Sequence, residues 1–332
     1  METNYILGVD GGGTKTDYLI FTTEGQWVDN IRAGSRSHEF LEGGFLEAEE
    51  KILADIEELL KKNSIKKSQV AGAAFGMAGI DTPVQLAKIK EILNKTGLNY
   101  AVSNDSILGI KAGCPSGVGI CSINGTGTVA SGINEKGEIL QIGGIGRATG
   151  DRAGGHYIAT LAVCSVYDYF FRCGQKTSLT GKIMDYFGIE NPIELLNVIS
   201  DRFYGDSEMD KTIVTYLFEA ANGGDEVSTG IVKEVADQLA KSVSGCILKL
   251  KFEETPEIIL AGSVWTKSDC PLLLTHFKER IFQYTGKVLE PVPLKVIPAA
   301  GALLWALELA VNHAPGPEQR NRIITSEVLK NL

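Results

Sequence analysis

The order of apolar runs along this chain occurs twice, and this repeat is the strongest constraint on its fold. Alternating or continuous apolar runs predict strands, and amphipathic runs predict helices. The first copy predicts three strands, a helix, a strand, a helix, a strand and a short helix, at residues 5–10, 16–22, 27–33, 44–63, 70–75, 84–93, 100–105 and 106–112. The second copy predicts the same order, with a longer helical stretch, at residues 118–123, 129–133, 139–142, 156–250, 258–264, 271–282, 294–297 and 299–310. We therefore expect an α/β fold of two βββαβα domains that face each other across a central cleft.

The chain length agrees with two domains. At about 150 residues per domain, 332 residues are enough for two hydrophobic cores. We expect an N-terminal lobe at residues 1–115 and a C-terminal lobe at residues 116–298, with a helical insertion at about 154–250. Residues 299–332 should form a C-terminal helix and tail that return to the N-terminal lobe.

A glycine-rich loop follows the first strand of each copy. The first loop reads Asp10-Gly-Gly-Gly-Thr-Lys15, and the second reads Asn124-Gly-Thr-Gly-Thr128. Because glycine has no Cβ, several backbone N–H groups can point at one anion, while threonine hydroxyls and Lys15 add donors. An ordinary hairpin needs only about two loop residues. These two loops therefore favour a nucleotide whose phosphates are held from both lobes.

Only the first loop begins with a carboxylate. Asp10, at the tip of its strand, could hold a hydrated magnesium ion that faces the phosphates. The Walker spacing Gly-x-x-x-x-Gly-Lys-Ser/Thr and the Gly-x-Gly-x-x-Gly fingerprint are both absent from the sequence. The chain therefore has neither a P-loop nor a Rossmann dinucleotide motif.

Composition excludes several other classes of protein. The formal net charge of −9 provides no basic surface, so we expect neither nucleic acid nor an anionic membrane as a partner. The six cysteines form no Cys-x-x-Cys motif, which argues against zinc or an iron–sulfur cluster within one chain. The start of the chain lacks a basic segment before an apolar core, and the longest apolar run, residues 299–311, is shorter than the ~20 residues of a membrane span. We expect a cytoplasmic protein.

Seven short motifs together carry a family resemblance. They are residues 8–16 (GVDGGGTKT), 104–106 (NDS), 124–128 (NGTGT), 143–146 (GGIG), 150–151 (GD), 261–265 (AGSVW) and 299–302 (AAGA). In combination and order, this set resembles the actin, Hsp70 and sugar-kinase superfamily. It is most similar to the N-acetylglucosamine kinase branch, which also contains the BadF/BadG/BcrA/BcrD type ATPases. The resemblance runs from about residue 5 to about residue 309 and implies an actin-like (ribonuclease H-like) fold with ATP and Mg²⁺ as cofactors.

The resemblance also implies roles for individual residues. Asp10 would face the magnesium ion, and Asp105 matches the carboxylate that acts as catalytic base on the sugar hydroxyl. The residues implied in ATP binding are Gly12, Gly13, Thr14, Lys15, Gly125, Thr126, Gly127, Thr128, Gly262 and Ser263. The residues implied in binding the amino sugar are Ser37, Gly79, Asp105, Gly144, Ile145 and Asp151.

Structural alternatives exist for several of these residues. Asp105 directly precedes a predicted helix at Ser106 and could cap its free N–H groups. Asp151 could organise its own loop, and the glycines at 143, 144 and 146 could serve turn geometry alone. Phosphoryl transfer requires one carboxylate near the acceptor hydroxyl, and Asp105 ends a strand, where ligands of α/β sheets bind.

The sequence departs from the family pattern at or next to residues that the resemblance implies in sugar binding. Arg152 follows Asp151 where relatives commonly have Glu-Gly-Ser, Ser37 stands in place of an asparagine, and Ile145 in place of an aromatic residue. These changes leave room for a bulkier substrate, so N-acetylmuramic acid is a hypothesis beside N-acetylglucosamine. Arg152 could pair with the lactyl carboxylate of that sugar, or it could be an ordinary surface arginine.

The expected function is an ATP- and magnesium-dependent kinase that phosphorylates an N-acetylated amino sugar at its 6-hydroxyl. The expected partner is this small molecule, and we expect a homodimer. One alternative is a BadF-type ATPase that activates a radical dehydratase or reductase, against which the scattered cysteines argue. A second alternative is a non-catalytic sugar sensor, against which the presence of both Asp10 and Asp105 argues.

Overall fold

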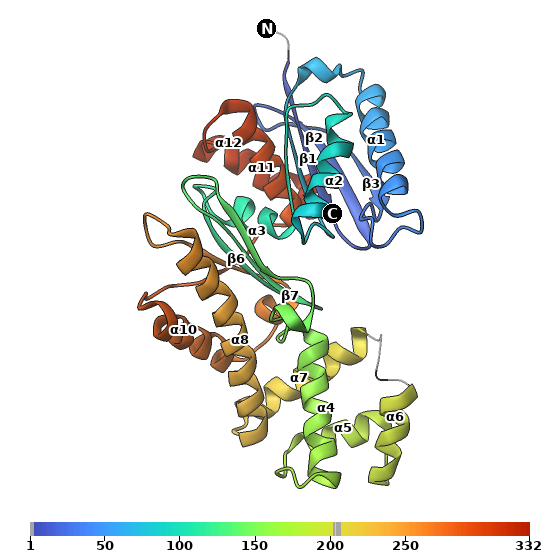
Figure 1. Ribbon diagram of the computed structural model, residues 1–332, viewed down its shortest axis with the longest axis vertical. Helices are drawn as coiled ribbons and strands as arrows, with labels where there is room; N and C mark the ends of the chain where they lie inside the picture. The colour runs from blue at the N-terminus through green and yellow to red at the C-terminus, as the bar shows by residue number, and fades with distance from the viewer. Residues whose placement is uncertain (1–2, 202, 204–206) are drawn as a thin grey trace. The chain divides into compact units, whose positions relative to one another are not determined.

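A computed structural model describes residues 3–201, 203 and 207–332 and contains two five-stranded sheets (Figure 1). The strand order is β3-β2-β1-β4-β5 in the first sheet and β8-β7-β6-β9-β10 in the second. In both sheets the first three strands of the chain are neighbours in chain order, and two later strands continue the sheet on the other side of the first strand. The predicted duplication is therefore confirmed.

The first sheet is built on β1, which is largely buried because a strand pairs with each of its edges and helices pack on both faces of the sheet. Its strands are β1 (Tyr5–Gly11), β2 (Lys15–Thr22), β3 (Trp27–Gly34), β4 (Val70–Met77) and β5 (Tyr100–Ser103). Successive side chains of a strand point to opposite faces. Accordingly, Leu7 and Val9 belong to one hydrophobic core, whereas Ile6 belongs to the other.

Helices complete these two cores of the first sheet. One core includes residues of α1 (Gly44–Lys62) and α2 (Pro83–Asn94), and the other includes residues of α11 (Pro298–Val311), α12 (Pro317–Ile324) and α13 (Glu327–Lys330). The short helix α3 (Ser106–Gly113) packs against α11. Gly301 permits this close approach, because a Cβ at this position would lie 2.1 Å from the carbonyl oxygen of Leu108.

The second sheet has the strands β6 (Gly119–Asn124), β7 (Thr128–Ile133), β8 (Ile139–Gly143), β9 (Ile258–Ala261) and β10 (Val292–Pro293). The prediction of a strand at residues 294–297 is wrong. The fifth strand is instead the pair Val292 and Pro293, which lies parallel to β9. Proline has no N–H to donate, so Pro291 and Pro293 limit this ladder to a short segment.

In the described residues of the helical insertion there are five α-helices, coloured green to orange in Figure 1. They are α4 (Gly155–Phe171), α5 (Leu179–Phe187), α6 (Leu195–Asp201), α7 (Ser207–Asn222) and α8 (Glu226–Leu250). After β9 follow the single turn α9 (Ser263–Thr266) and α10 (Pro271–Thr285), which packs along α8. Within the described part of the chain, no helix is both long and apolar enough to cross a membrane.

Packing divides the chain into two compact units. The first contains residues 1–121, 132–139 and 294–332, and the second contains residues 122–131 and 140–293. This division runs through β6, β7 and β8, whereas the lobe limits expected from the sequence follow the two sheets. Those limits therefore stay a prediction.

Candidate functional site

Two carboxylates lie at strand ends along one edge of the first sheet, with β4 between their two strands. Asp10 is the sixth residue of β1, and Asp105 follows β5; both strands run parallel to β4, so their carboxyl ends share one edge of the sheet. Burial raises the pKa of Asp10 to about 7, the charges of Asp105 and Asp17 add to this shift, and Lys15 opposes it. The ionised form of Asp10 is therefore disfavoured without a counter-charge, and a divalent cation would supply one.

The Asp105 side chain does not cap α3. It occupies the N-cap position without a side-chain cap hydrogen bond, and the Ser106 N–H instead donates to Asn104 Oδ1 at 2.9 Å. Burial raises the pKa of Asp105 to about 6, and the charge of Asp81 adds to the shift, although backbone N–H groups oppose it. The carboxylate is thus more basic than an exposed aspartate and is still largely ionised at neutral pH.

The β1–β2 loop is closed by a hydrogen bond from the Gly12 N–H to the Lys15 carbonyl oxygen at 2.8 Å. Gly12 and Gly13 are half-buried, whereas Thr14 and Lys15 are exposed. The Lys15 ammonium lies 3.2 Å from Asp17 Oδ2 and 3.2 Å from the carbonyl oxygen of Leu332. Its contacts in this structure are therefore with the protein's own acceptors.

Ser37 and Gly79 meet close to the same edge of the sheet. Gly79 has a φ of 82°, and a Cβ on it would lie 2.6 Å from Ser37 Oγ. Two residues further along, Asp81 Oδ1 accepts a hydrogen bond from Asn104 Nδ2 at 3.2 Å. The structure thus brings together three of the residues that the sequence suggested for sugar binding, Ser37, Gly79 and Asp105, within one unit.

The β6–β7 loop of the second unit packs tightly against two other glycine-containing turns. The Gly155 N–H, at the start of α4, donates to the Gly125 carbonyl oxygen at 2.8 Å. Gly262 has a φ of 89°, and a Cβ there would lie 2.3 Å from the Asn124 carbonyl oxygen, so only glycine fits this position. Thr126 and Gly127 at the loop tip are exposed.

A cavity of about 270 Å³ adjoins this loop, and all of its lining residues belong to the second unit. The β6–β7 loop contributes Gly125 and Thr126, and the turn after β9 contributes Ser263. Val264, Lys267 and Ser268 add to the wall on the side of that turn, and the start of α4 and α7 provide the rest, with His156, Ser207, Asp210, Lys211, Val214, Thr215 and Phe218 among their residues. Gly125, Thr126 and Ser263, predicted from the sequence to bind ATP, therefore line one cavity.

Asp151 organises its own loop. Its carboxylate accepts hydrogen bonds from the Gly144 N–H at 2.9 Å and from the Gly146 N–H at 2.5 Å. Ile145, between these glycines, is 57% exposed. Gly144, Ile145 and Asp151 therefore form one small turn of the second unit, whereas Ser37, Gly79 and Asp105 belong to the first unit.

Sequence reasoning missed several residues that shape these sites. Asn104 and Asp81 flank Asp105, and a local signal for Asn104 was available because asparagine readily accepts from the N–H two residues on. His156 Nδ1 lies 3.1 Å from Asp210 Oδ2 and joins α4 to α7 beside the cavity. No local pattern predicts that second pair, because its members are 54 residues apart.

The carboxylates near Asp10 suit a magnesium ion that takes most of its ligands from water and from the phosphates of a bound substrate. In the described ranges, no three His, Cys, Asp or Glu residues gather into a site that could hold a metal ion by themselves. Magnesium commonly needs only one or two protein carboxylates, with waters and phosphate oxygens as its other ligands. Asp10 can supply such a carboxylate. The buried hydroxyl of Thr16 and the buried amide of Asn124, one next to each glycine loop, make no hydrogen bond with any residue that the structure describes, as expected beside a polar ligand.

Comparisons with known proteins agree with this architecture. The profile of the BadF/BadG/BcrA/BcrD ATPase family matches residues 7–306. The chain is 28% identical over 264 residues to the N-acetylmuramic acid/N-acetylglucosamine kinase of Clostridium acetobutylicum, covering 78% of this chain and 85% of that protein. It is 25% identical over 326 residues to the N-acetyl-D-glucosamine kinase of Dictyostelium discoideum, covering 92% of this chain and 99% of that protein.

Solved structures show the same fold. A proposed N-acetylglucosamine kinase from Chromobacterium violaceum has a TM-score of 0.61 at 17% identity, covering 92% of this chain and 99% of that one. The ROK hexokinase from Thermus thermophilus has a TM-score of 0.53 at 14% identity, covering 93% and 98%. The predicted fold class, a duplicated actin-like α/β fold, is confirmed. The roles of individual residues stay predictions.

Proposed function

Because the chain belongs to the BadF/BadG/BcrA/BcrD ATPase family, we propose that it is an ATP- and magnesium-dependent kinase of an N-acetylated amino sugar. The proposed substrates are N-acetylglucosamine and N-acetylmuramic acid, the sugars named for its curated relatives. The proposed acceptor is the 6-hydroxyl, a primary alcohol that a single general base can activate.

The observation that carries this proposal is the Asp105 carboxylate. It is half-buried at a strand end, it does not cap α3, and its pKa is raised to about 6 by burial and by Asp81. A base with a pKa just below the working pH is largely ionised and yet accepts a proton readily. Asp105 would take the proton of the sugar hydroxyl as that oxygen attacks the γ-phosphorus of ATP. Positioned bases of this kind contribute about 10²- to 10⁴-fold in rate.

The glycine loops would bind the phosphates of ATP. In the first unit, the backbone N–H of Gly13 and the hydroxyl of Thr14 are candidate donors, whereas the Gly12 N–H shapes the loop by donating to the Lys15 carbonyl oxygen. In the second unit, Thr126 and Gly127 at the exposed loop tip are the corresponding candidates, because the Gly125 N–H and the Thr128 hydroxyl donate to carbonyl oxygens of the protein. The cavity beside Gly125 and Ser263 would receive the adenosine. A magnesium ion held by Asp10 would neutralise phosphate charge, which is the main electrostatic requirement of phosphoryl transfer.

The sugar would be oriented by short loops rather than by a large apolar pocket. Ser37 and Gly79 lie in contact in the first unit. The hydrogen bond between Asp81 and Asn104 connects the segment after Gly79 to the residue that precedes Asp105. Asp151 would act mainly by holding the turn that presents Gly144 and Ile145, since its carboxylate already accepts two backbone N–H groups of that turn.

A panel of amino sugars tests the proposal. The purified full chain is incubated with ATP, Mg²⁺ and each sugar, ADP release is measured, and ³¹P NMR locates the phosphate on the product. We expect ADP release that depends on an N-acetylated amino sugar and a 6-phosphate as product. ADP release that is independent of every sugar would instead identify an ATPase without a sugar acceptor.

A further inference from the structure

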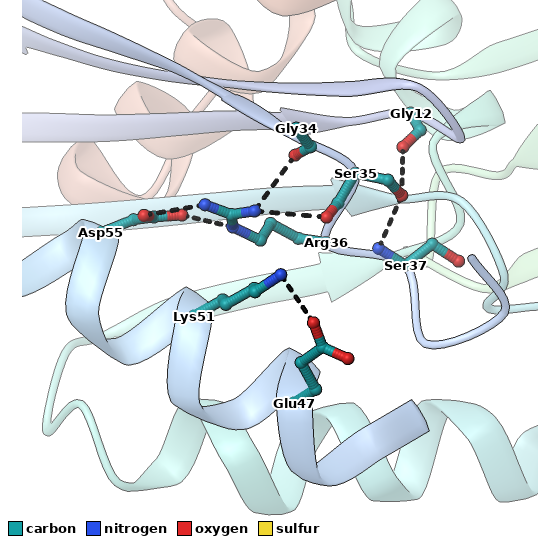
Figure 2. A network of polar contacts seen from close by, with 8 residues as sticks. All are labelled: Gly12, Gly34, Ser35, Arg36, Ser37, Glu47, Lys51 and Asp55. Carbon is teal, nitrogen blue, oxygen red and sulfur yellow. Dashed lines mark hydrogen bonds and ion pairs between the residues drawn. The ribbon is translucent and has the colours of Figure 1, made fainter. Parts of the chain in front are cut away.

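A buried ion pair anchors the loop that follows β3, as Figure 2 shows. Arg36 Nε lies 2.6 Å from Asp55 Oδ2, and Arg36 Nη2 lies 3.1 Å from Asp55 Oδ1, so the pair is bidentate. The side chains are only 13% and 12% exposed. The remaining terminal nitrogen donates to the carbonyl oxygens of Gly34 and Ser35, at 3.5 and 3.3 Å. The guanidinium therefore fixes the start of this loop to α1.

One hydroxyl connects this loop to the glycine loop after β1. Ser35 Oγ donates to the Gly12 carbonyl oxygen at 3.2 Å and accepts from the Ser37 N–H at 3.2 Å (Figure 2). Gly12 belongs to the loop assigned to the phosphates of ATP, and Ser37 belongs to the loop assigned to the sugar. Ser35 is thus the shared hydrogen-bonding partner of both loops.

Further contacts extend this connection on both sides. A Cβ on Gly13 would lie 3.0 Å from the Phe40 ring, so this ring packs directly on the glycine loop. On the other side, Gln85 Nε2 donates to Glu39 Oε1 at 3.3 Å, and Gln85 Oε1 accepts from the Asp81 N–H at 3.0 Å. The segment 35–40 therefore contacts the proposed nucleotide loop on one side. On the other side it contacts Gln85, which holds Asp81, the hydrogen-bonding partner of Asn104.

This inference rests on the proposed function. We propose that Ser35 and Arg36 are positioning residues that couple nucleotide binding at Gly12 and Gly13 to the placement of Ser37 against the sugar. Nucleotide bound to the glycine loop restricts Gly12, and the Ser35 hydroxyl transmits this restriction to the Ser37 backbone. A loop that one ligand has already ordered costs the second ligand less to order, so the two ligands bind with positive coupling.

The first test measures this coupling by calorimetry. The dissociation constant of N-acetylglucosamine is determined with and without AMPPNP and Mg²⁺. The coupling factor is the value without nucleotide divided by the value with nucleotide. We expect a factor above one in the wild type. Ser35→Ala should reduce it by about two- to tenfold, as expected for one lost hydrogen bond, while each ligand alone binds within about twofold of wild type.

Matched variants separate positioning from general stability. Ser35→Thr keeps the hydroxyl and should restore the coupling factor. Arg36→Lys keeps the charge but loses the bidentate geometry, so it should lower the factor as well. Lys51→Ala removes a partly exposed ion pair with Glu47 on the same helix α1 and should leave the factor unchanged. A wild-type factor of one, or a Ser35→Ala factor equal to that of the wild type, would overturn the proposal.

A second test needs no sugar. Amide hydrogen exchange is followed with and without ADP and Mg²⁺. In the wild type, ADP should slow exchange at the Ser37 and Phe40 amides, which bond to Ser35 Oγ and to the Ser37 carbonyl oxygen. Ser35→Ala should abolish this slowing at Ser37. Protection confined to residues 10–16 would overturn the coupling alone, whereas absence of any nucleotide binding would refute the proposed function together with it.

Discussion

Replacement of Asp105 by asparagine should remove phosphorylation and, at the same time, stabilise the ligand-free protein. Asparagine has nearly the same shape but cannot accept the sugar proton, so we expect a loss of about 10²- to 10⁴-fold in turnover. Stabilisation is expected because burial and the charge of Asp81 raise the pKa of Asp105 to about 6 from its ordinary 3.8. The folded state therefore disfavours the ionised carboxylate.

The size and pH dependence of this stabilisation follow from the two pKa values. A difference of about two pKa units corresponds to about 3 kcal/mol, and partial exposure of the side chain reduces the expected gain to about 1 to 2 kcal/mol. Below pH 3.8 the carboxyl is protonated in the folded and unfolded states alike, so the variant has no advantage. As pH rises through about 6, the Asp105 carboxyl of the folded wild type ionises, and the wild type loses the stability that the protonated carboxyl had provided. The advantage of the variant should therefore grow from about pH 4 to about pH 7 and then remain level.

Urea unfolding of both proteins at pH 4.5 and pH 8, without ATP or metal, measures this difference, and ADP release measures turnover. Asp237→Asn is the control of opposite sign: although burial opposes it, hydrogen bonds from Lys241, Tyr284 and Arg280 lower the pKa of Asp237 to about 2. That variant should be destabilised at pH 8 and retain turnover. If Asp105→Asn were no more stable than wild type at pH 8, or phosphorylated sugar at the wild-type rate, the reasoning on Asp105 would be refuted.

Three other substitutions test separate parts of the site. Asp10→Asn should shift the magnesium dependence of turnover to concentrations at least tenfold higher, because the carboxylate proposed for the metal is lost; an unchanged magnesium titration would exclude it as a ligand. Gly262→Ala should weaken AMPPNP binding severalfold, since its Cβ would lie 2.3 Å from the Asn124 carbonyl oxygen, whereas Gly230→Ala, in α8 with open space around it, should bind normally. Arg152→Ala should reduce turnover of N-acetylmuramic acid relative to N-acetylglucosamine, and an identical ratio of the two rates would remove Arg152 from sugar selection.

Most of the fold could be predicted from the sequence because its signals are local. Alternation of apolar residues predicted nine of the ten strands closely, and the repeated order of strands and helices predicted the shared topology of the two sheets. The tenth strand was placed too late in the chain. Its two residues, Val292 and Pro293, pair with β9 through tertiary contact, and so short a strand between prolines has no apolar pattern of its own.

The candidate site was predicted less completely. Glycine loops and strand-end carboxylates such as Asp10 and Asp105 are visible in the sequence, since they combine a special backbone requirement with a charged residue at an element boundary. The sequence could not decide whether Asp105 caps α3. The structure answered this: Asn104 accepts from the Ser106 N–H, which is a local contact, and donates its own amide to Asp81, which is a tertiary contact.

What the sequence by itself determined is the duplicated order of elements and the places where phosphate donors interrupt them, since both depend on residues that are neighbours in the chain. Tertiary structure alone decided which distant side chains meet: Arg36 with Asp55, Ser35 with Gly12, and His156 with Asp210. Such pairs form only when packing of the whole core brings separate elements within hydrogen-bonding distance. For that reason, the loops that would hold ATP and sugar could be predicted, whereas the hydrogen bonds that position them could not.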